Sequence, residues 1–156
     1  MLSKLTTSAQ TRQWPGHIPV EYVYTAGIAG EAFLRALKDR GMLLTSQCPQ
    51  CQTVYLPARL YCEQCFEETK QYEEIAPKGW VHTYTVAHVD IDGEALAVPQ
   101  IYAFIRFGGT NGGLIHRLGQ TQPHQVSIGM EVEALLLPGK ERTGSINDIT
   151  CFQPTK

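Results

Sequence analysis

The chain has 156 residues, enough for one ordinary domain or two small ones. Its 13 basic and 15 acidic side chains give a net charge of −2, which argues against nucleic acid as the main partner, because such binders depend on cations that contact phosphate. No apolar run approaches the roughly 20 residues of a membrane span, and the N-terminus lacks the apolar core of a secretory signal, so we expect a cytoplasmic protein with no membrane partner.

Residues 1–23 form a polar segment that is interrupted by Pro15 and Pro19. This composition predicts an N-terminal arm that has no packed core of its own. Trp14 is the exception, a large apolar side chain in a polar segment. It is expected either to fold back onto its own domain or to anchor the arm on a partner.

The segment 24–42, which contains TAGIAGEAFLRALKDRG, predicts a helix over about 27–40. Phe33 and Leu37 repeat at helical spacing, and Gly41 follows as a C-terminal stop. Basic side chains lie in the last turn, where the helix dipole favours cations. The charged outer face of this helix is either plain solvated surface or a binding face.

The segment 43–72 holds four of the five cysteines, in the stretch CPQCQTVYLPARLYCEQC. Their pattern is Cys48-x2-Cys51-x10-Cys62-x2-Cys65. The two knuckles flank TVYLPARLY, in which apolar and polar residues alternate as they do in two short strands. The layout predicts a rubredoxin-like zinc ribbon whose knuckles bring four thiolates into one tetrahedral cage. In a reducing compartment, metal binding is favoured over disulfides.

A cage of four protein sulfurs predicts a structural metal, because no position stays open for water or substrate. Zinc is favoured over iron, since rubredoxin-type iron sites usually carry glycine after each knuckle and Gln52 and Phe66 stand there. The alternative is a pair of thioredoxin-like redox motifs, which would need a strand-to-helix turn. Cys151 is expected to be a small buried apolar side chain.

The segment 73–156 shows an apolar period of two, which is typical of strands. Five strand candidates follow one another: WVHTYTVAHV, IYAFIRF, GLIHRL, MEVEALLL and SINDITCF. The glycine-rich GGTNGG joins the second to the third as a hairpin loop. Five strands of this size predict a closed OB-fold barrel, with a half-open sandwich as the alternative. The expected fold class is therefore mainly β with an N-terminal helix: a zinc ribbon followed by a five-stranded OB-fold barrel.

We predict no catalytic residue in this chain. The GGTNGG loop lacks the Lys-Ser/Thr pair of a phosphate-binding loop. His82, His88 and His116 fall on predicted barrel strands. They could form a metal or acid–base site, or they could be ordinary barrel residues. Asp90 and Asp92 flank a turn and are explained by turn chemistry.

The order helix, ribbon, barrel resembles a known family of zinc-ribbon plus OB-fold proteins, the domain of unknown function 35 (DUF35). The matching stretches are TAGIAGEAFLRALKDRG, CPQCQTVYLPARLYCEQC, GWVHTYTV and GMEVEALLLPGKERTGSINDITCFQP, so the resemblance covers residues 24–154. Ala58 stands where a second proline often follows Pro57, and Gln52 replaces the usual knuckle glycine; neither departure removes a metal ligand. The resemblance implies a non-catalytic accessory role beside thiolase-type enzymes, acyl-CoA hydratases or steroid side-chain aldolases.

The resemblance also implies a structural zinc ion, and a CoA thioester shared with a thiolase-like catalytic subunit in a hetero-oligomer, including thiolases of anaerobic aromatic degradation. CoA needs cations at its phosphates and apolar contacts along its arm. The residues expected to supply them are Arg35, Lys38, Arg40, Tyr55, Arg59, Tyr61 and Phe66. The alternative function is a single-stranded nucleic-acid-binding module, because zinc ribbons and OB barrels can both bind single strands and the barrel strands carry aromatic residues. A third reading is a stand-alone hydrolase that uses the barrel histidines.

Overall fold

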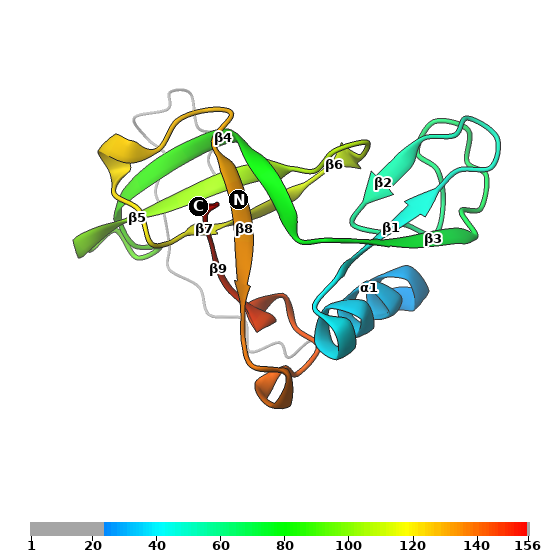
Figure 1. The fold of residues 1–156 in the computed structure, drawn as a ribbon, viewed down its shortest axis with the longest axis horizontal. Coiled ribbons are helices and arrows are strands. Elements are labelled where there is room, and N and C mark those ends of the chain that lie inside the picture. The colour runs from blue at the N-terminus through cyan, green and yellow to red at the C-terminus, as the bar shows by residue number, and fades with distance from the viewer. Residues whose placement is uncertain (1–23, 156) are drawn as a thin grey trace, which may run out of the picture.

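The computed structural model describes residues 24–155, so the predicted arm at 1–23, with Trp14, lies outside the described residues. Figure 1 shows two connected parts, a small sheet with a helix beneath it and a barrel beside them. Within the described residues, no helix combines the length and the apolar character needed to cross a membrane.

Helix α1 (Gly27–Arg40) has the predicted span. Its buried face carries Phe33, Ala36 and Leu37, which pack into the main core. The helix ends at Gly41, whose backbone is left-handed and whose N–H donates to the Leu37 carbonyl at 3.0 Å. The periodic apolar face and the glycine stop therefore fix this element from local sequence alone.

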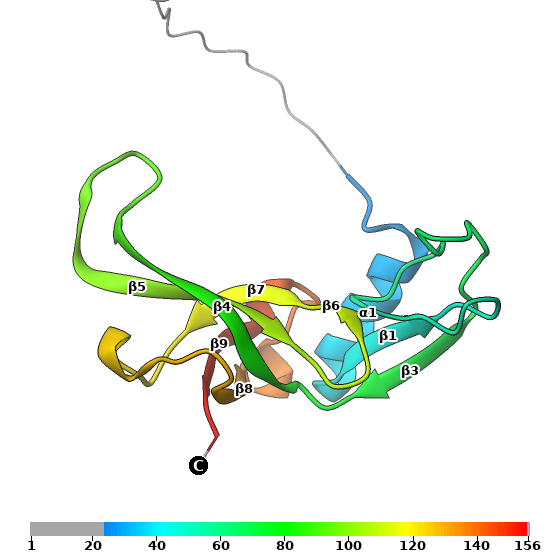
Figure 2. The same cartoon turned by 90° about the horizontal axis from the view of Figure 1, so that it is seen from above.

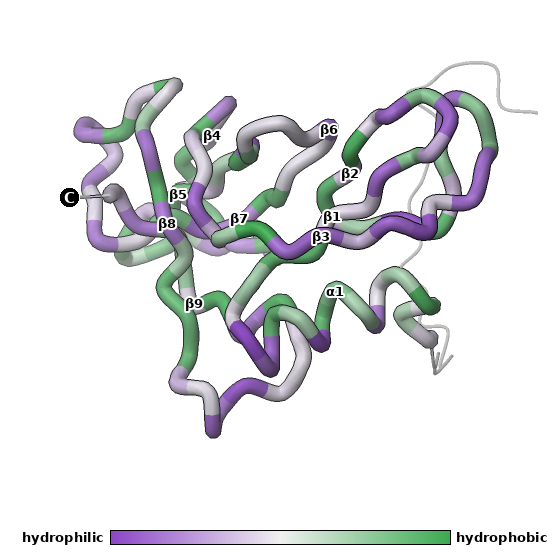
Figure 3. Tube along the Cα trace, turned by 45° about the vertical axis from the view of Figure 1, so that its right-hand side comes forward, coloured by the Kyte–Doolittle hydropathy of each residue, from purple (hydrophilic) through white to green (hydrophobic). Residues whose placement is uncertain are grey.

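The ribbon sheet has the strand order β3-β1-β2-β6. Its strands are β1 (Leu43–Gln47), β2 (Val54–Leu56), β3 (Gln71–Ile75) and β6 (Asn111–Gly112). Of the two short strands expected in TVYLPARLY, the first forms β2, whereas Tyr61 makes only an isolated bridge to Glu68. The edge strand β3 is largely hydrophilic, as Figure 3 shows.

The barrel is closed and has the strand order β4-β5-β7-β9-β8, which confirms the five-stranded OB-fold prediction. Its strands are β4 (Lys78–Val89), β5 (Ala95–Arg106), β7 (Leu114–Leu118), β8 (Glu131–Leu136) and β9 (Ile149–Pro154). Single 3-10 turns are η2 (Pro123–Gln125), η3 (Gly139–Glu141) and η4 (Ile146–Asp148). The C-terminal part of β4 and the N-terminal part of β5 extend beyond the barrel as a two-stranded hairpin (Figure 2).

The glycine-rich loop between β5 and β7 ties the barrel to the ribbon. Its strand β6 pairs in parallel with β2 of the ribbon sheet. Gly112 has φ +102°, and a Cβ there would lie 2.3 Å from the Leu56 carbonyl oxygen. The N–H of Gly113 donates to the same oxygen at 3.0 Å. The loop is a hairpin connection as expected, and it also serves as the joint between the two parts.

A single hydrophobic core runs through the helix, the ribbon and the barrel. Leu43 and Leu56 of the ribbon sheet belong to the same buried cluster as Val81 and Phe152 of the barrel. A second, smaller buried cluster comprises Cys48, Tyr55 and Cys62, with Cys65 packed against it. The ribbon is therefore fastened at its base by apolar packing, and its tip depends on the cysteines.

Candidate metal centre

The two knuckles bring the predicted cysteines together at the tip of the ribbon. Their four sulfurs lie within 4.8 Å of one another, with 3.3 Å between Cys48 and Cys65 and 3.5 Å between Cys51 and Cys62. A tetrahedral ion with metal–sulfur bonds of about 2.3 Å needs sulfurs about 3.8 Å apart. The set therefore fits one tetrahedral ion, and its all-sulfur chemistry suits zinc.

Both knuckles have the same backbone geometry. The N–H of Gln52 donates to the Cys48 carbonyl at 3.0 Å, and the N–H of Phe66 donates to the Cys62 carbonyl at the same distance. Gln52 and Phe66 have φ values of 60° and 58°, in the left-handed region that glycine normally occupies. These are the two positions where rubredoxin-type knuckles usually carry glycine, so Gln52 and Phe66 adopt a backbone conformation that is strained for them.

Cys62 is the best-stabilised thiolate of the set. The Tyr55 hydroxyl lies 3.2 Å from its sulfur, and the Gln64 N–H donates to the same sulfur at 3.4 Å. The hydrogen bond from Tyr55 lowers the pKa of Cys62. That bond and burial raise the pKa of Tyr55 to about 12, so the phenol keeps its proton and remains the donor.

The other sulfurs show why the cage needs a cation. The Thr53 hydroxyl lies 3.2 Å from the Cys51 sulfur and lowers the pKa of that thiol. The pKa of Cys65 is raised, first by its hydrogen bond to Cys48 and then by burial. The thiols of Cys51 and Cys62 therefore lose their protons readily, whereas Cys65 keeps its proton in the hydrogen bond to Cys48. A divalent ion would stabilise all four sulfurs as thiolates.

The helical cations predicted to contact CoA lie along α1. Arg35 pairs with Glu31 at 2.7 Å, and Arg40 pairs with Glu74 of the ribbon sheet. Lys38 is exposed. Arg35 and Lys38 border a groove of about 330 Å³ between α1 and the turn before η4, whereas Arg40 does not line it.

The predicted ribbon residues fall into exposed and buried positions. Tyr61 and Phe66 are 58% and 81% exposed, and both side chains are open to a ligand or a partner. The Arg59 guanidinium lies 5.0 Å from the Tyr55 ring centroid and pairs with Glu63. Tyr55 itself is fully buried, so in this structure it offers the metal cage a hydroxyl and offers a ligand no surface.

The barrel histidines are not gathered into one site. His82 packs edge-to-face on Phe104, and His116 packs in the same manner on Phe152. Within residues 24–155, the only cluster of metal-ligating side chains is the cysteine set. Cys151 is buried, as expected for a small apolar residue. The sequence does not predict that the Tyr55 hydroxyl contacts the Cys62 sulfur. The one hint is that Tyr55 lies on a short strand directly after the first knuckle.

Known proteins match nearly the whole of the described chain. The family model of the "ChsH2, rubredoxin-like zinc ribbon domain" matches residues 35–71, and that of the "ChsH2, C-terminal OB-fold domain" matches residues 72–136. A DUF35 domain-containing scaffold protein of Methanocaldococcus jannaschii is 35% identical over 109 residues, which cover 69% of this chain and 76% of that protein. A protein of the same description from Methanothermobacter thermautotrophicus is 27% identical over 108 residues, which cover 69% of this chain and 80% of that protein.

Solved structures agree with these matches. A DUF35-family protein of unknown function from Sulfolobus solfataricus has a TM-score of 0.63 and 30% identity, over 82% of this chain and 84% of that one. The Ltp2-ChsH2(DUF35) aldolase has a TM-score of 0.57 at 24% identity, over 80% of this chain and 93% of that one, so the two chains share a fold. By its ribbon, its barrel and these relatives, the chain belongs to the DUF35 family.

Proposed function

We propose that this chain is a non-catalytic accessory subunit of a thiolase-like enzyme complex, in which it helps to bind acyl-CoA and stabilises the catalytic partner. Relatives of the chain are named scaffold proteins. A solved protein of the same fold is an Ltp2-ChsH2(DUF35) aldolase, whose name joins a DUF35 chain to a second component. Both names support an assembly role.

The observation that carries the proposal is the closed cage. Cys48, Cys51, Cys62 and Cys65 supply a full tetrahedral set of sulfurs, so an ion held there has no position left for substrate. When bound, zinc supplies structural cross-linking of the two knuckles and not Lewis-acid chemistry. The chain's own residues then hold the ribbon in shape beside α1 and the barrel.

Two exposed surfaces, one beside α1 and one on the ribbon, have groups that CoA requires. Arg35 and Lys38 border the groove beside α1, together with Glu31 and Asp39, and their cations suit a diphosphate. Tyr61 and Phe66 project from the ribbon and suit the adenine or the pantetheine arm. These four residues are the ones we propose for CoA, and a diphosphate would displace the exposed ion pair of Arg35 with Glu31. Arg40 and Arg59 are also paired with carboxylates and do not line the groove, and Tyr55 is buried.

Purification from the native host tests the assembly role. The tagged chain is expected to co-purify with a thiolase-type subunit, and a thiolase of anaerobic aromatic degradation such as benzoylsuccinyl-CoA thiolase is the partner to examine first. Thiolytic turnover of the catalytic subunit, measured with and without this chain, should rise in its presence. Unchanged turnover together with no co-purifying enzyme contradicts the proposal, as does thioester cleavage by the isolated chain.

Calorimetric titration of the zinc-loaded chain with CoA tests the binding surface. The double variant Arg35→Gln/Lys38→Gln is expected to weaken CoA binding at least tenfold. Lys70→Gln serves as the matched control, because Lys70 is an exposed ribbon cation that pairs with Glu68 and lies outside the groove. Equal affinity in all three proteins would remove the helix groove from the proposal.

A further inference from the structure

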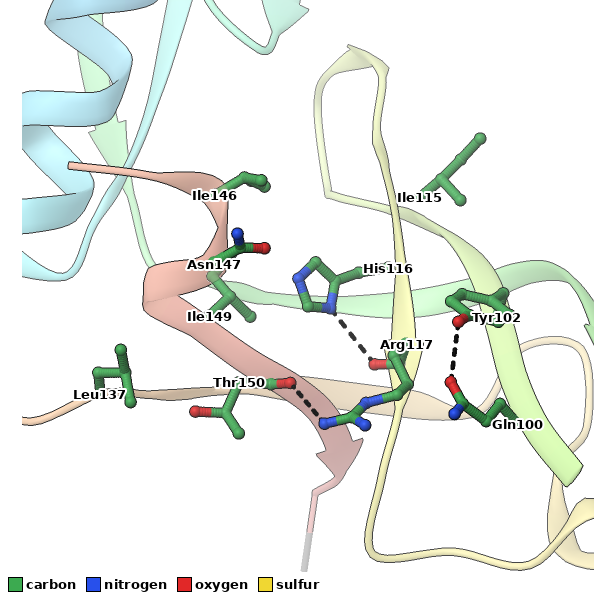
Figure 4. A pocket seen from close by; sticks show the side chains of 10 residues that line it. All are labelled: Gln100, Tyr102, Ile115, His116, Arg117, Leu137, Ile146, Asn147, Ile149 and Thr150. Carbon is green, nitrogen blue, oxygen red and sulfur yellow. Dashed lines mark hydrogen bonds between the residues drawn. The ribbon is translucent and has the colours of Figure 1, made fainter. Parts of the chain in front are cut away.

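The barrel has a groove of its own, between strands β7 and β9. These strands are neighbours in the barrel, but their ladder consists of a single residue pair, Leu118 with Phe152. Beyond that pair the two strands diverge, and η4, which leads into β9, lies on the side of the gap opposite β7 (Figure 4). The resulting groove has a volume of about 640 Å³, inside the range of roughly 300–1,000 Å³ that small-molecule sites occupy.

Apolar side chains form the walls of this groove. Ile115 on β7 is 75% exposed, and Ile146 of η4 and Tyr102 of β5 are partly exposed on either side of the opening. Figure 4 shows Ile146 and Ile115 on opposite sides of His116. Isoleucine is usually buried, and two exposed isoleucines that line one concavity make a surface that gains free energy when an apolar group covers it.

Arg117 is the single charged side chain that lines the groove. Its Nη2 donates to the Thr150 carbonyl at 3.2 Å, which tethers the guanidinium between β7 and β9. Other cations of the described chain, such as Arg35, Arg40 and Arg59, are paired with a carboxylate. The groove contains no acidic side chain, so the other donors of Arg117 remain for an anion.

Neutral polar side chains complete the lining: Gln100, His116, Asn147 and Thr150. The His116 ring points into the groove between β7 and η4, with its edge against Phe152 at 5.7 Å between centroids. Burial lowers the pKa of His116, so at neutral pH it adds a hydrogen-bonding group and no second charge. Asn147 adds an amide on the other side. The groove therefore combines one positive charge, several neutral polar groups and apolar walls.

We propose that this groove binds an apolar carboxylate, an aromatic or branched-chain organic acid whose carboxylate pairs with Arg117 and whose body lies against Tyr102, Ile115 and Ile146. The complement of a single guanidinium is a single anionic group, and the complement of the walls is a compact apolar body. A nucleic-acid strand would need several cations along its path, and this groove offers one. The inference uses none of the residues proposed for CoA and stands independently of that function.

The test uses zinc-loaded full-length protein and 2-naphthoate, with 2-naphthamide as the neutral analogue. Amide chemical shifts in NMR are expected to change at Ile115, His116 and Asn147 on titration with 2-naphthoate. Arg117→Gln should weaken binding of 2-naphthoate at least tenfold and leave the weaker binding of 2-naphthamide unchanged. Lys140→Gln, which removes an exposed cation outside the groove, should bind as the parent does.

A second variant separates the walls from the charge. Ile115→Ala removes an exposed side chain and is expected to weaken both probes by a similar factor of several-fold, with unchanged thermal unfolding. Equal 2-naphthoate affinity in the parent and Arg117→Gln overturns the proposal, and so does the absence of shifts at the groove. An oligonucleotide that shifts the same amides with a steep salt dependence, when 2-naphthoate does not, assigns the face to nucleic acid and also overturns it.

Discussion

At the scale of single residues, the metal centre combines strain with stabilisation. Gln52 and Phe66 hold left-handed backbone without the freedom of glycine, at a cost on the order of 1–3 kcal/mol each. Phe66 recovers little of that cost, because its ring is exposed. Binding of structural zinc in small domains contributes roughly 10–16 kcal/mol, which exceeds the strain of both knuckles. A bound zinc ion would therefore be enough to hold both conformations.

The hydrogen bond between Tyr55 and Cys62 is expected to tune the affinity for the metal. Tyr55→Phe removes the hydroxyl and keeps the buried ring, so the pKa of Cys62 should rise and protons should compete better for the sulfur. We expect zinc affinity to fall about 10–100-fold and the pH of half-release to move upward. Competition with a chromogenic chelator across pH 5–8 measures both.

Tyr61→Phe is the matched control, because Tyr61 lies on the same ribbon and its side chain is exposed. It should leave both quantities at their parent values. If Tyr55→Phe and the parent released zinc at the same pH, the hydroxyl would have no part in the cage.

The sequence predicts which four cysteines come together but not which residues surround them, for a physical reason. A spacing of three residues within each knuckle encodes the cage locally, so Cys48 and Cys51 are predictable from their own segment. The part played by Tyr55 depends on how β2 packs against the second knuckle, which no local pattern records. Likewise, the carboxylates that pair with Arg40 and Arg59 become visible only in the folded chain.

At the scale of elements, the turn at residues 143–148 separates the groove beside α1 from the groove in the barrel. The buried Asp148 carboxylate holds this turn, because it accepts the backbone N–H groups of Thr143, Gly144 and Ser145. Burial opposes ionisation of Asp148, but these hydrogen bonds outweigh it and the net effect lowers its pKa. This capping delays the start of the predicted strand SINDITCF: its first half forms η4, and β9 begins only at Ile149.

Asp148→Asn is expected to lower the free energy of unfolding by roughly 2–3 kcal/mol at pH 7, because an amide offers one acceptor where the carboxylate offers two. The folded pKa of Asp148 is below the ordinary value of 3.8, so its contribution is present above about pH 4 and is lost as pH falls through the folded value. The stability gap between parent and variant should therefore shrink in acid. Urea unfolding at pH 7 and below pH 4 measures it, and a gap independent of pH would contradict this role.

The glycine joint is the second element with a measurable contribution. Gly112→Ala would place a methyl group against the Leu56 carbonyl oxygen at a φ that alanine rarely adopts. We expect a loss of roughly 2–4 kcal/mol in stability and faster hydrogen exchange at the Gly113 amide. Thermal unfolding and exchange NMR test this.

Gly109→Ala is its control in the same loop, since Gly109 also has positive φ but a Cβ there meets nothing within 4 Å. It should cost about 1–2 kcal/mol, from backbone strain alone. Equal losses in the two variants would show that the contact with Leu56 does not stabilise the joint.

The elements that the sequence predicts well are those with a strong local period. The helix span and the barrel strands follow from repeats of 3.6 and 2 residues. No local pattern predicts strand β1, because four of its five residues are buried and no alternation marks it. None predicts strand β3 either, since QYEEI is a polar edge held in place by its pairing with β1. Strand β6 depends entirely on the docking of its loop against β2.

At the scale of the whole molecule, two kinds of force hold the chain, and they are separated in space. The main core is shared by helix, ribbon base and barrel, whereas the ribbon tip rests on Cys48, Tyr55 and Cys62. A partner that binds the ribbon tip would thus meet a surface whose shape depends on metal, carried on a body whose shape does not. This arrangement suits a scaffold, because docking can be lost without unfolding the whole chain.

Removal of zinc is therefore expected to release the tip and leave the barrel folded. With a strong chelator, the amides of Gln52 and Phe66, which close the two knuckles, should lose protection from hydrogen exchange at least 100-fold. Amides in the β5–β7 ladder, such as that of Ala103, should keep theirs, because the core beneath them contains no cysteine sulfur from the cage. Exchange NMR with and without zinc distinguishes this from a single cooperative transition, in which the barrel amides would lose protection together with the knuckles.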